Sequence, residues 1–320
     1  MPRSSHNPAQ PPRHRPAARP RQPELLSSRD NRWLKRFAAS LAGKSGVAEK
    51  SVGIEGARLV DEALRSSLPI EAILVSETGR KHLARLAGAL DSATRVLATT
   101  DRLFRQVAGT ESPQGVAALV LPRRANFDDL VQGDGEPLVI VLAGVQDPGN
   151  VGTILRTAEA LGASGVATCN AGVLGTAHAF SPKVVRASAG AAFRIPIAEE
   201  LSPAILLAQL RVSGIRILAA TSTADARDAT APWLVDLCGP IAFFIGNEGA
   251  GLPGEIERVA DVRVRIPLAA TRGLHAENVE SLNAATACAI LLYEAARQRS
   301  GAKIRPAELN PRAITSGANS

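Results

Sequence analysis

The stretch AFFIGNEGAGLP, residues 242–253, decides how the second half of this chain is interpreted. A run of apolar, β-favouring residues leads directly into a turn that holds three glycines. Such a turn normally lets backbone amides close around a phosphate. Glu248 argues against a phosphate here, because its carboxylate would repel a pyrophosphate and the turn contains no Lys or Arg. The stretch therefore predicts a strand end that approaches a ligand closely, and the surrounding motifs have to identify that ligand.

Length and composition describe a globular protein. The chain has 320 residues, of which 45% are hydrophobic and 21% charged, which allows about two domains. Apolar runs such as residues 137–145 are far shorter than the roughly 18 residues of a membrane-spanning helix, and the start of the chain lacks the apolar core of a secretory signal. Three widely separated cysteines favour small buried side chains in a reducing cytoplasm over a disulfide framework or a metal site. They are Cys169, Cys238 and Cys288.

The positive charge is concentrated at the amino terminus. The formal net charge is +7, and residues 1–36 contain nine basic and two acidic residues, so the remainder is neutral overall. This segment is rich in Pro and has almost nothing apolar before Leu25, so we expect residues 1–28 to form a disordered tail that binds RNA or DNA phosphates without sequence preference. A solubilising tail and an organellar transit segment are the alternatives. The prolines disfavour the amphipathic helix that a transit segment needs.

Residues 29–122 are predicted to form a small α/β domain. Helical and strand patterns alternate along this segment. We expect helices at 32–43, 57–67, 79–90 and 101–109, and strands at 51–56, 71–77, 94–100 and 115–122. The polar stretch 123–136 is typical of a linker.

A second α/β domain is predicted over residues 137–299. Its strands are continuous apolar runs, which indicate a parallel sheet with helices on both faces. We expect them at 138–145, 165–170, 215–221, 241–246 and 262–267. The last helix, 281–299, is apolar nearly all round between Ala284 and Ala296, so it should be buried on more than one side, in the core or in a subunit interface. A flexible tail is expected over residues 300–320.

Polar residues occur where packing alone would not require them. In the stretch 146–165, Arg156 faces away from the apolar stripe of its predicted helix, and Asn150 lies at the start of that helix. Taken singly, a helix cap and a solvated arginine are the more ordinary roles. In the stretch 181–197, Lys183 and Arg186 are three residues apart beside small residues. That spacing suits phosphate contact, although an exposed basic turn has the same appearance.

In this order, the stretches resemble the SpoU (TrmH) family of RNA ribose 2′-O-methyltransferases, part of the SPOUT superfamily. The similarity covers roughly residues 46–299. Its motifs are NVGTILRTAEALGASGV (150–166), KVVRASAGA (183–191), IGNEGAGL (245–252) and IPL…ESLNAATACAILLYE (266–294). Two further stretches, VGIEGARLVDEAL (52–64) and TESPQGVAALV (110–120), resemble the family's N-terminal substrate-binding domain, which is related to a ribosomal-protein RNA-binding fold.

The resemblance implies that the glycine turn holds S-adenosylmethionine. The adenosine would be bound by backbone groups, and the positive sulfonium makes Glu248 acceptable in the turn. In the family this pocket is part of a trefoil knot, a rare exception to unknotted folds, and the protein is a homodimer whose active site draws on both subunits. By the family pattern, the donor pocket is expected to include Gly246, Ile266, Leu268, Leu282 and Thr221.

The resemblance also implies the catalytic roles. The family assigns activation of the ribose 2′-hydroxyl to the arginine of the first motif, here Arg156. A guanidinium is effectively always protonated, so the alternative is that Arg156 orients a substrate phosphate while a phosphate or water accepts the proton. The rest of the site is expected to comprise Asn150, Glu248, Ser281 and Asn283, and the RNA contacts Lys183, Arg186 and Arg58.

One departure from the family lies between residues 268 and 280. The family usually has a very short connection there, whereas this chain has the insertion AATRGLHAENV, residues 269–279. Because the insertion lies beside the donor pocket, it is able to reshape the lid or to bring Arg272 and His275 to the RNA. His275 is interpreted as an ordinary loop histidine.

Two other function classes were weighed. A dinucleotide-dependent oxidoreductase needs G-x-G-x-x-G after its first strand and an acid about 20 residues later, and residues 141–152 lack that spacing. A catalytically inactive RNA-binding protein should have lost some of Asn150, Arg156, Glu248 and Asn283, and all four are present. Ribosomal RNA is favoured over tRNA, because family members with this N-terminal domain mostly act there.

Overall fold

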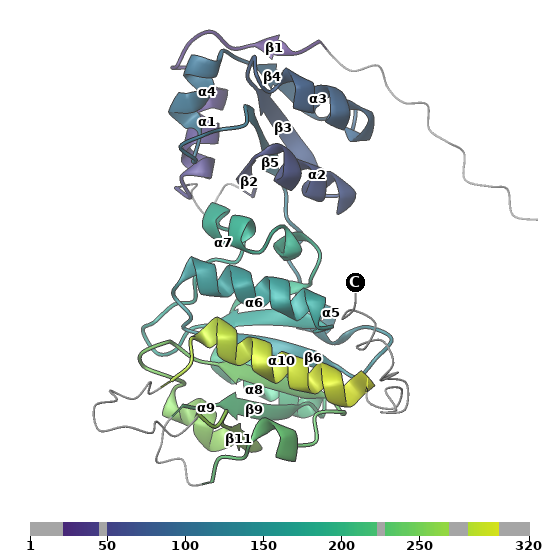
Figure 1. Ribbon diagram of the computed structural model, residues 1–320, viewed down its shortest axis with the longest axis vertical. Coiled ribbons are helices and arrows are strands. Elements are labelled where there is room, and N and C mark those ends of the chain that lie inside the picture. Colours follow the sequence, from purple (N-terminus) through teal and green to yellow (C-terminus); the bar gives the residue numbers. More distant parts are fainter. Residues whose placement is uncertain (1–21, 45–49, 223–227, 269–280, 301–320) are drawn as a thin grey trace, which may run out of the picture.

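The chain folds into two α/β units, one above the other in Figure 1. The computed structural model describes residues 22–44, 50–222, 228–268 and 281–300. Most of the predicted basic tail, the insertion with Arg272 and His275, and the predicted tail after residue 300 lie outside the described residues.

The N-terminal unit is a five-stranded sheet in the order β1-β4-β3-β5-β2, with β5 antiparallel to both of its neighbours. Apolar side chains of α1 and α4 pack on one face, and those of α2 and α3 pack on the other. The predicted alternation of helices and strands is confirmed. The elements are β1 (Glu24–Leu25), α1 (Arg32–Leu41), β2 (Val52–Glu55), α2 (Ala57–Arg65), β3 (Ile70–Val75), α3 (Arg80–Leu86), η1 (Ala87–Ala89), β4 (Arg95–Ala98), α4 (Asp101–Val107) and β5 (Val116–Val120).

The prediction of a disordered tail through residue 28 is wrong at its end. Glu24 and Leu25 pair with β4, and Leu26 is only 2% exposed. Leu26 N donates to Ala98 O at 2.7 Å, and Thr99 Oγ1 donates to Leu26 O at 2.9 Å. Two apolar residues are too few to form a periodic pattern, so this edge strand depends on pairing with a distant segment.

The second unit is a six-stranded, fully parallel sheet in the order β11-β9-β10-β6-β7-β8. The sequence predicted five of these strands and missed β8, because the stretch that forms it turns acidic after two apolar residues. The elements are β6 (Leu138–Ala143), α6 (Pro148–Ala160), β7 (Gly165–Cys169), α7 (Pro182–Ala187), η2 (Ala191–Phe193), β8 (Ile197–Leu201), α8 (Pro203–Val212), β9 (Arg216–Ala220), η3 (Pro232–Leu234), β10 (Ile241–Ile245), α9 (Gly254–Val259), β11 (Val262–Val264) and α10 (Ala284–Ser300).

Helices cover both faces of this sheet, as predicted. Every residue of β6 is apolar because successive side chains pack on opposite faces of the sheet and both faces are covered. Ile140 packs in a cluster with side chains of α6, α7 and α10, whereas Val141 packs with side chains of α8, α9 and a further helix, α5 (Phe127–Val131). Figure 1 shows α6 and α10 side by side over the first of these faces.

The predicted linker 123–136 contains a helix, α5 (Phe127–Val131). Asn126 and Asp129 form a reciprocal capping box at its start. Its Leu130 packs so closely on β7 that a Cβ at Gly165 would lie 2.7 Å from a Leu130 methyl. The polar composition of the stretch concealed a helix that uses only two buried side chains, Phe127 and Leu130.

Within this chain helix α10 is buried on one side, so of the two expected places for its second burial, the core does not provide it and the subunit interface stays a prediction. Its buried side chains, among them Cys288 and Leu292, face α6 and the sheet. The opposite side leaves Ile290 38% exposed and Tyr293 62% exposed. This single chain therefore does not supply the second burial that the composition of the helix requires.

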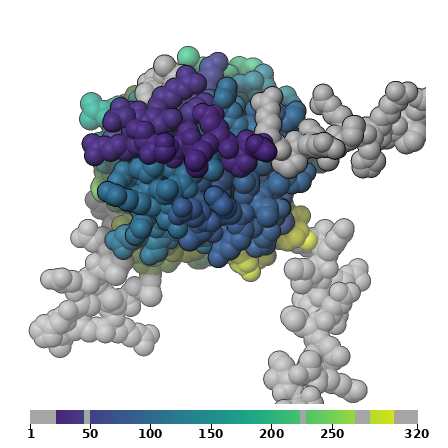
Figure 2. All heavy atoms as spheres, turned by 90° about the horizontal axis from the view of Figure 1, so that it is seen from above, coloured from purple at the N-terminus to yellow at the C-terminus, as the bar shows by residue number. Residues whose placement is uncertain are grey.

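The two units share one hydrophobic core. Val60 of α2 and Val184 of α7 belong to the same buried cluster, and α7 lies between the units in Figure 1. At the rim, the Arg194 guanidinium donates to Glu62 of α2 at 2.7 Å and to Glu159 of α6 at 2.9 Å. Figure 2 shows the N-terminal unit from above, with the segment 22–44 lying across it in purple. The contact between the units therefore combines buried apolar side chains with a charged rim.

The cysteines are all free, and two of them are buried. Burial raises the pKa of Cys169 to about 11 and that of Cys288 to about 12, so neither thiol ionises near neutral pH. Cys238 is exposed, contrary to the expectation that all three would be buried. Among the described residues, no helix is long and apolar enough to cross a membrane.

Candidate active site at the carboxyl edge of the parallel sheet

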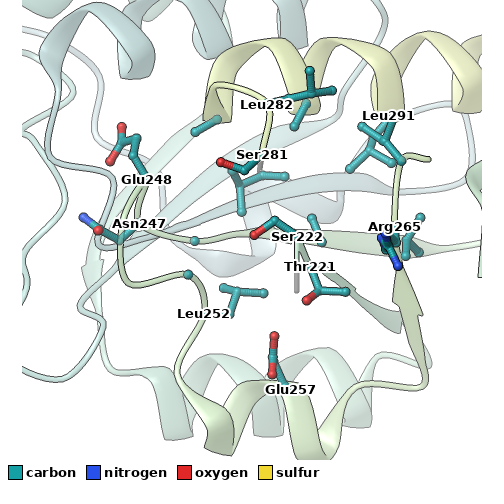
Figure 3. Close-up of a pocket in the computed structure, with 18 of the residues that line it drawn as sticks. Thr221, Ser222, Asn247, Glu248, Leu252, Glu257, Arg265, Ser281, Leu282 and Leu291 are labelled. Atoms are coloured by element: carbon teal, nitrogen blue, oxygen red, sulfur yellow. The ribbon is translucent and has the colours of Figure 1, made fainter. Parts of the chain in front are cut away.

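A cavity of about 180 Å³ opens at the carboxyl ends of three neighbouring strands, β11, β9 and β10. The turn after β10 forms one wall, and the start of α10 covers it (Figure 3). The wall mixes apolar side chains, backbone and a few polar groups, as ligand pockets usually do. It includes Thr221, Ser222, Gly246, Leu252, Ile266 and Leu282.

The topology explains the position of the cavity. The chain starts this sheet in the middle with β6, extends it through β7 and β8 on one side, and then crosses to build β9, β10 and β11 on the other. Ligands of parallel sheets bind where the winding direction changes, at the carboxyl ends of the strands. The loops that follow β6 and β10 meet at this point, so Asn150 and Glu248 come together although 98 residues separate them.

The glycine turn after β10 is closed on itself. Asn247 Oδ1 accepts hydrogen bonds from the backbone N–H groups of Gly249 and Ala250, both at 2.9 Å, and Gly251 N donates to Asn247 O at 3.0 Å. The turn folds back so tightly that a Cβ at Gly246 would lie 2.4 Å from the carbonyl carbon of Gly251. Because these three amides are already bonded, the turn does not offer the cradle of free N–H groups that a phosphate requires.

A chain of side-chain hydrogen bonds crosses the mouth of the cavity. Asn283 Nδ2 donates to Asn150 Oδ1 at 2.9 Å, and Asn150 Nδ2 donates to Glu248 Oε1 at 2.7 Å. The amide orientations are fixed, because Asn283 Oδ1 accepts from the N–H groups of Ala285 and Thr286 in the first turn of α10. The two asparagines therefore direct a hydrogen-bond donor to the Glu248 carboxylate beside the cavity.

Asn150 is available for this role because it is not the cap of its helix. Asp147 occupies the N-cap of α6, and its Oδ1 accepts from Asn150 N at 2.8 Å. The sequence had left open a capping role for Asn150, and the structure excludes it. The Asn150 side chain is thus a connector between two other segments.

The charges of the cavity suit a cationic or neutral ligand better than an anionic one. Glu248 and Glu257 line it with their carboxylates, and Arg265 is its one guanidinium among the described residues. Figure 3 shows Glu248 near Ser281 on one side of the cavity and Glu257 on the opposite side, pointing toward Thr221. A pyrophosphate would meet two carboxylates here and gain one cation.

The structure brings most of the predicted site residues together. The five residues assigned to the donor pocket all line the cavity, as do Glu248 and Ser281. Asn150 and Asn283 join them through the hydrogen-bonded chain. Arg156 is the exception, since it lies on the exposed side of α6 and does not line the cavity. Of the predicted RNA contacts, Lys183 and Arg58 are exposed and Arg186 is partly buried.

Several residues of the site were not given a role from the sequence. Asn247 is the most important, because its side chain closes the glycine turn and also donates to Gly144 O at 2.9 Å. An asparagine followed by small residues in a turn is a signal for this geometry. Ser222, Glu257 and Arg265 also line the cavity. Nothing in their local sequence distinguishes them from other surface residues.

Comparison with known proteins identifies the family. A model described as the SpoU rRNA Methylase family matches residues 137–293, and one described as an MRM3-like substrate binding domain matches residues 44–118. A 23S rRNA (guanosine-2′-O-)-methyltransferase RlmB of Ralstonia nicotianae is 34% identical over 218 residues, which cover 67% of this chain and 82% of that protein. The chain belongs to the SpoU family. The resemblance noted in the sequence is confirmed.

Other relatives agree with this assignment. The 23S rRNA (guanosine(2553)-2′-O)-methyltransferase RlmP of Bacillus subtilis is 29% identical over 269 residues, covering 84% of this chain and 97% of its own. An AdoMet-bound rRNA methyltransferase from Sinorhizobium meliloti has a TM-score of 0.72 at 29% identity, covering 86% of this chain and 97% of its own. The SpoU methyltransferase AviRb from Streptomyces viridochromogenes, in complex with AdoMet, has a TM-score of 0.69 at 26% identity, covering 84% and 98% of the two chains.

Replacing Gly246 with Ala is expected to weaken ligand binding in this cavity. The added Cβ would collide with the Gly251 carbonyl carbon at 2.4 Å, and that atom is backbone, so the whole turn must shift. We expect S-adenosylmethionine, the ligand of two similar structures, to bind at least about tenfold more weakly in calorimetry, and stability to fall by about 1–3 kcal/mol. Gly254→Ala is the matched control, because a Cβ there meets nothing within 4 Å. Equal donor affinity in the two variants would contradict the role given to the turn.

Proposed function

We propose that this protein transfers a methyl group from S-adenosylmethionine to a ribose 2′-hydroxyl of ribosomal RNA. The observation that carries the proposal is the hydrogen-bonded chain from Asn283 through Asn150 to Glu248, at the mouth of a cavity formed by a closed glycine turn. Residues 29–122 serve as the substrate-binding domain and residues 137–299 as the catalytic domain. The similarity to enzymes of this activity supports the same assignment.

The residues of the cavity fit the methyl donor. Leu252, Ile266 and Leu282 supply apolar surface for an adenine ring, and the exposed backbone beside Gly246 allows close approach to a nucleoside. Glu248 supplies a negative charge for a sulfonium. The closed turn, which lacks free amides for a phosphate, is consistent with a ligand that carries none. The trefoil knot of the family stays a prediction for this chain.

Methyl transfer depends more on the alignment of the two reactants and on the charges around them than on a side chain that accepts a proton. S-adenosylmethionine supplies an electrophilic methyl group, so that a C–O bond to the ribose forms while the C–S bond breaks and the hydroxyl proton leaves. Asn150 and Glu248 hold the mouth of the cavity in one arrangement, which aligns the two reactants. Arg156 orients the phosphate next to the target ribose and stabilises the developing charge. A guanidinium does not accept the proton, so a phosphate oxygen or water does.

The protein works as a homodimer. Arg156 is exposed and outside the cavity of its own chain, so it acts on RNA bound at the partner subunit. The outer side of α10 presents Ile290 and Tyr293. The Gln298 side chain of this helix donates to Val235 O at 3.0 Å, next to η3, which carries the exposed Trp233. An exposed apolar area of this kind marks an interface. A second copy supplies the burial that the sequence of α10 predicts.

Ribosomal RNA is the substrate favoured by the relatives and by the N-terminal unit. Both relatives described above are named as 23S rRNA enzymes, and residues 44–118 match a substrate-binding domain. Lys183 and Arg186 on α7 and Arg58 on α2 are basic residues suited to the RNA backbone. Such an enzyme acts in the cytoplasm, where free cysteines persist.

Arg156→Ala is expected to abolish methylation and to leave the fold intact. Removing an exposed arginine should change stability by no more than about 0.5 kcal/mol, whereas losing a catalytic one should slow single-turnover methylation at least about 100-fold, nearly 3 kcal/mol of barrier. Arg211→Ala on α8 is the control. Mapping of 2′-O-methylated nucleotides in total RNA should show one ribosomal position that depends on the wild-type gene and stays unmethylated with Arg156→Ala. If the position whose methylation depends on the wild-type gene lies in tRNA, the substrate is tRNA and not ribosomal RNA. If no methylated position depends on the gene, the protein is an inactive RNA-binding protein.

Ile290→Glu is expected to give a monomer without activity. The charge would be placed in the centre of the exposed apolar side of α10, where Ile290 is 38% exposed. Light scattering coupled to size exclusion should report half the wild-type mass. Ile205→Glu is the matched control, because Ile205 is 60% exposed on α8, on the other face of the sheet. A wild-type protein that is itself monomeric, or an active Ile290→Glu monomer, would refute the dimeric site.

A further inference from the structure

An ion pair outside the cavity joins the loop after β7 to the edge strand β8. His178 Nδ1 lies 2.9 Å from Glu199 Oε1, and Ala179 N donates to the same oxygen at 2.8 Å. The Glu199 side chain is 7% exposed, whereas that of His178 is 45% exposed. Glu199 Oε2 is buried and has no hydrogen-bond partner in the described part of the chain. A buried carboxylate with so little compensation favours a positive charge on its one close basic neighbour.

The surroundings keep His178 protonated to higher pH than usual. Its hydrogen bond to Glu199 is the main cause of a raised pKa, burial opposes it, and the charges of Glu199 and Glu200 add to the increase, while Arg124 lowers it. Phe180 N approaches the same Nδ1 at 3.3 Å, a longer contact that needs an unprotonated nitrogen. The shorter contact with Glu199 places the Nδ1 proton in the ion pair, which leaves Nε2–H as the second donor of an imidazole that is 45% exposed.

The position of His178 links the catalytic edge to the basic helix α7. Ala177 N donates to Val145 O at 2.8 Å, and Asn247 Nδ2 donates to Gly144 O, so the loop before His178 is attached to the strand end that leads to Asn150. On the other side, Ser181 N donates to His178 O at 3.0 Å, and Ser181 is the N-cap of α7. His178 therefore lies between the reacting edge and Lys183.

We propose that His178, held by Glu199, is an RNA-binding residue whose Nε2–H donates to a phosphate oxygen of the substrate backbone. The inference rests on the function proposed above and adds a residue that the family motifs do not include. Arg124 is exposed and near enough to act on the charge of His178, and Lys183 is an exposed basic residue of the helix that begins just after His178. Because a neutral imidazole binds a phosphate less well than an imidazolium, RNA affinity becomes sensitive to pH near neutrality.

The sign of the effect follows from the raised pKa. His178 is fully charged below its ordinary value of 6.5 and loses its charge as pH rises through the higher value in the folded protein. The RNA affinity of the wild type should therefore fall severalfold between pH 6 and pH 8.5. His178→Gln should bind about three- to tenfold more weakly at pH 6.5 and lose this dependence. Glu199→Gln, which keeps the size of the side chain but removes its charge, should move the midpoint to lower pH.

The experiment is fluorescence anisotropy at fixed salt, with the full chain and a labelled transcript of 23S ribosomal RNA, at half-unit pH steps. His82→Gln is the matched control, because burial and then Lys81 and Arg85 lower the pKa of His82, so this histidine loses its charge at a lower pH than His178 does. The same pH profile for His82→Gln and the wild type supports the proposal. Thermal unfolding checks that each variant folds. If His178→Gln does not fold, the pH profile of Glu199→Gln alone tests the proposal.

Three results would overturn the inference. An unchanged pH profile in His178→Gln and Glu199→Gln would mean that the pair only ties β8 to its loop. A pH profile that is lost together with affinity for S-adenosylmethionine would assign the group to the donor cavity. The absence of RNA binding by the wild type at every pH would refute the proposed function as well, whereas a flat profile with retained binding refutes only the role of His178.

Discussion

The side-chain amide of Asn150 joins three segments that are distant in the sequence. It accepts from Asn283 at the start of α10 and donates to Glu248 in the turn after β10, while its own helix follows β6. Each neighbour is fixed by a second contact, since Asn283 caps α10 and the turn is closed by Asn247. Both hydrogen bonds lie in exposed surroundings, where water competes with them, so they set the geometry of the three segments more than they stabilise the fold. The hydrogen bonds of Asn150 therefore join α6, α10 and the turn after β10 at the mouth of the cavity.

This constraint also explains the selectivity for a ligand without phosphate. A glycine turn at the end of a parallel strand is usually an anion site, because its amides point outward. Here the Asn247 side chain accepts hydrogen bonds from two of those amides, and the turn carries the acidic residue Glu248. The same sequence feature, glycines after a strand, thus serves opposite ligands according to whether the amides are free. The N-terminal unit, joined through α7 and Arg194, adds the surface for a large anionic substrate, so that the two binding tasks are kept apart.

Most of the fold was predictable from periodicity, and most of the site from the motifs. The buried strands and long helices carry strong apolar patterns, and the five residues predicted for the donor pocket all line one cavity. The elements that were missed, β1, β8 and α5, bury no more than two side chains each, so their stability comes from tertiary pairing that no local pattern records. The contacts of Asn150 and Asn247 were unpredictable for the same reason. Arg156 was recognised by its motif alone, since its position on an exposed helix face gives it no partner in the cavity of its own chain.

The central claim is that the closed glycine turn belongs to a methyl-donor site and not to a phosphate site. Isothermal titration of the full chain with S-adenosylmethionine and, separately, with NAD tests it most directly, because the two ligands share an adenosine and differ in the sulfonium and the pyrophosphate. The account predicts saturable binding of S-adenosylmethionine, lost in Glu248→Lys, and no measurable heat with NAD. Tight binding of NAD without binding of S-adenosylmethionine would contradict it.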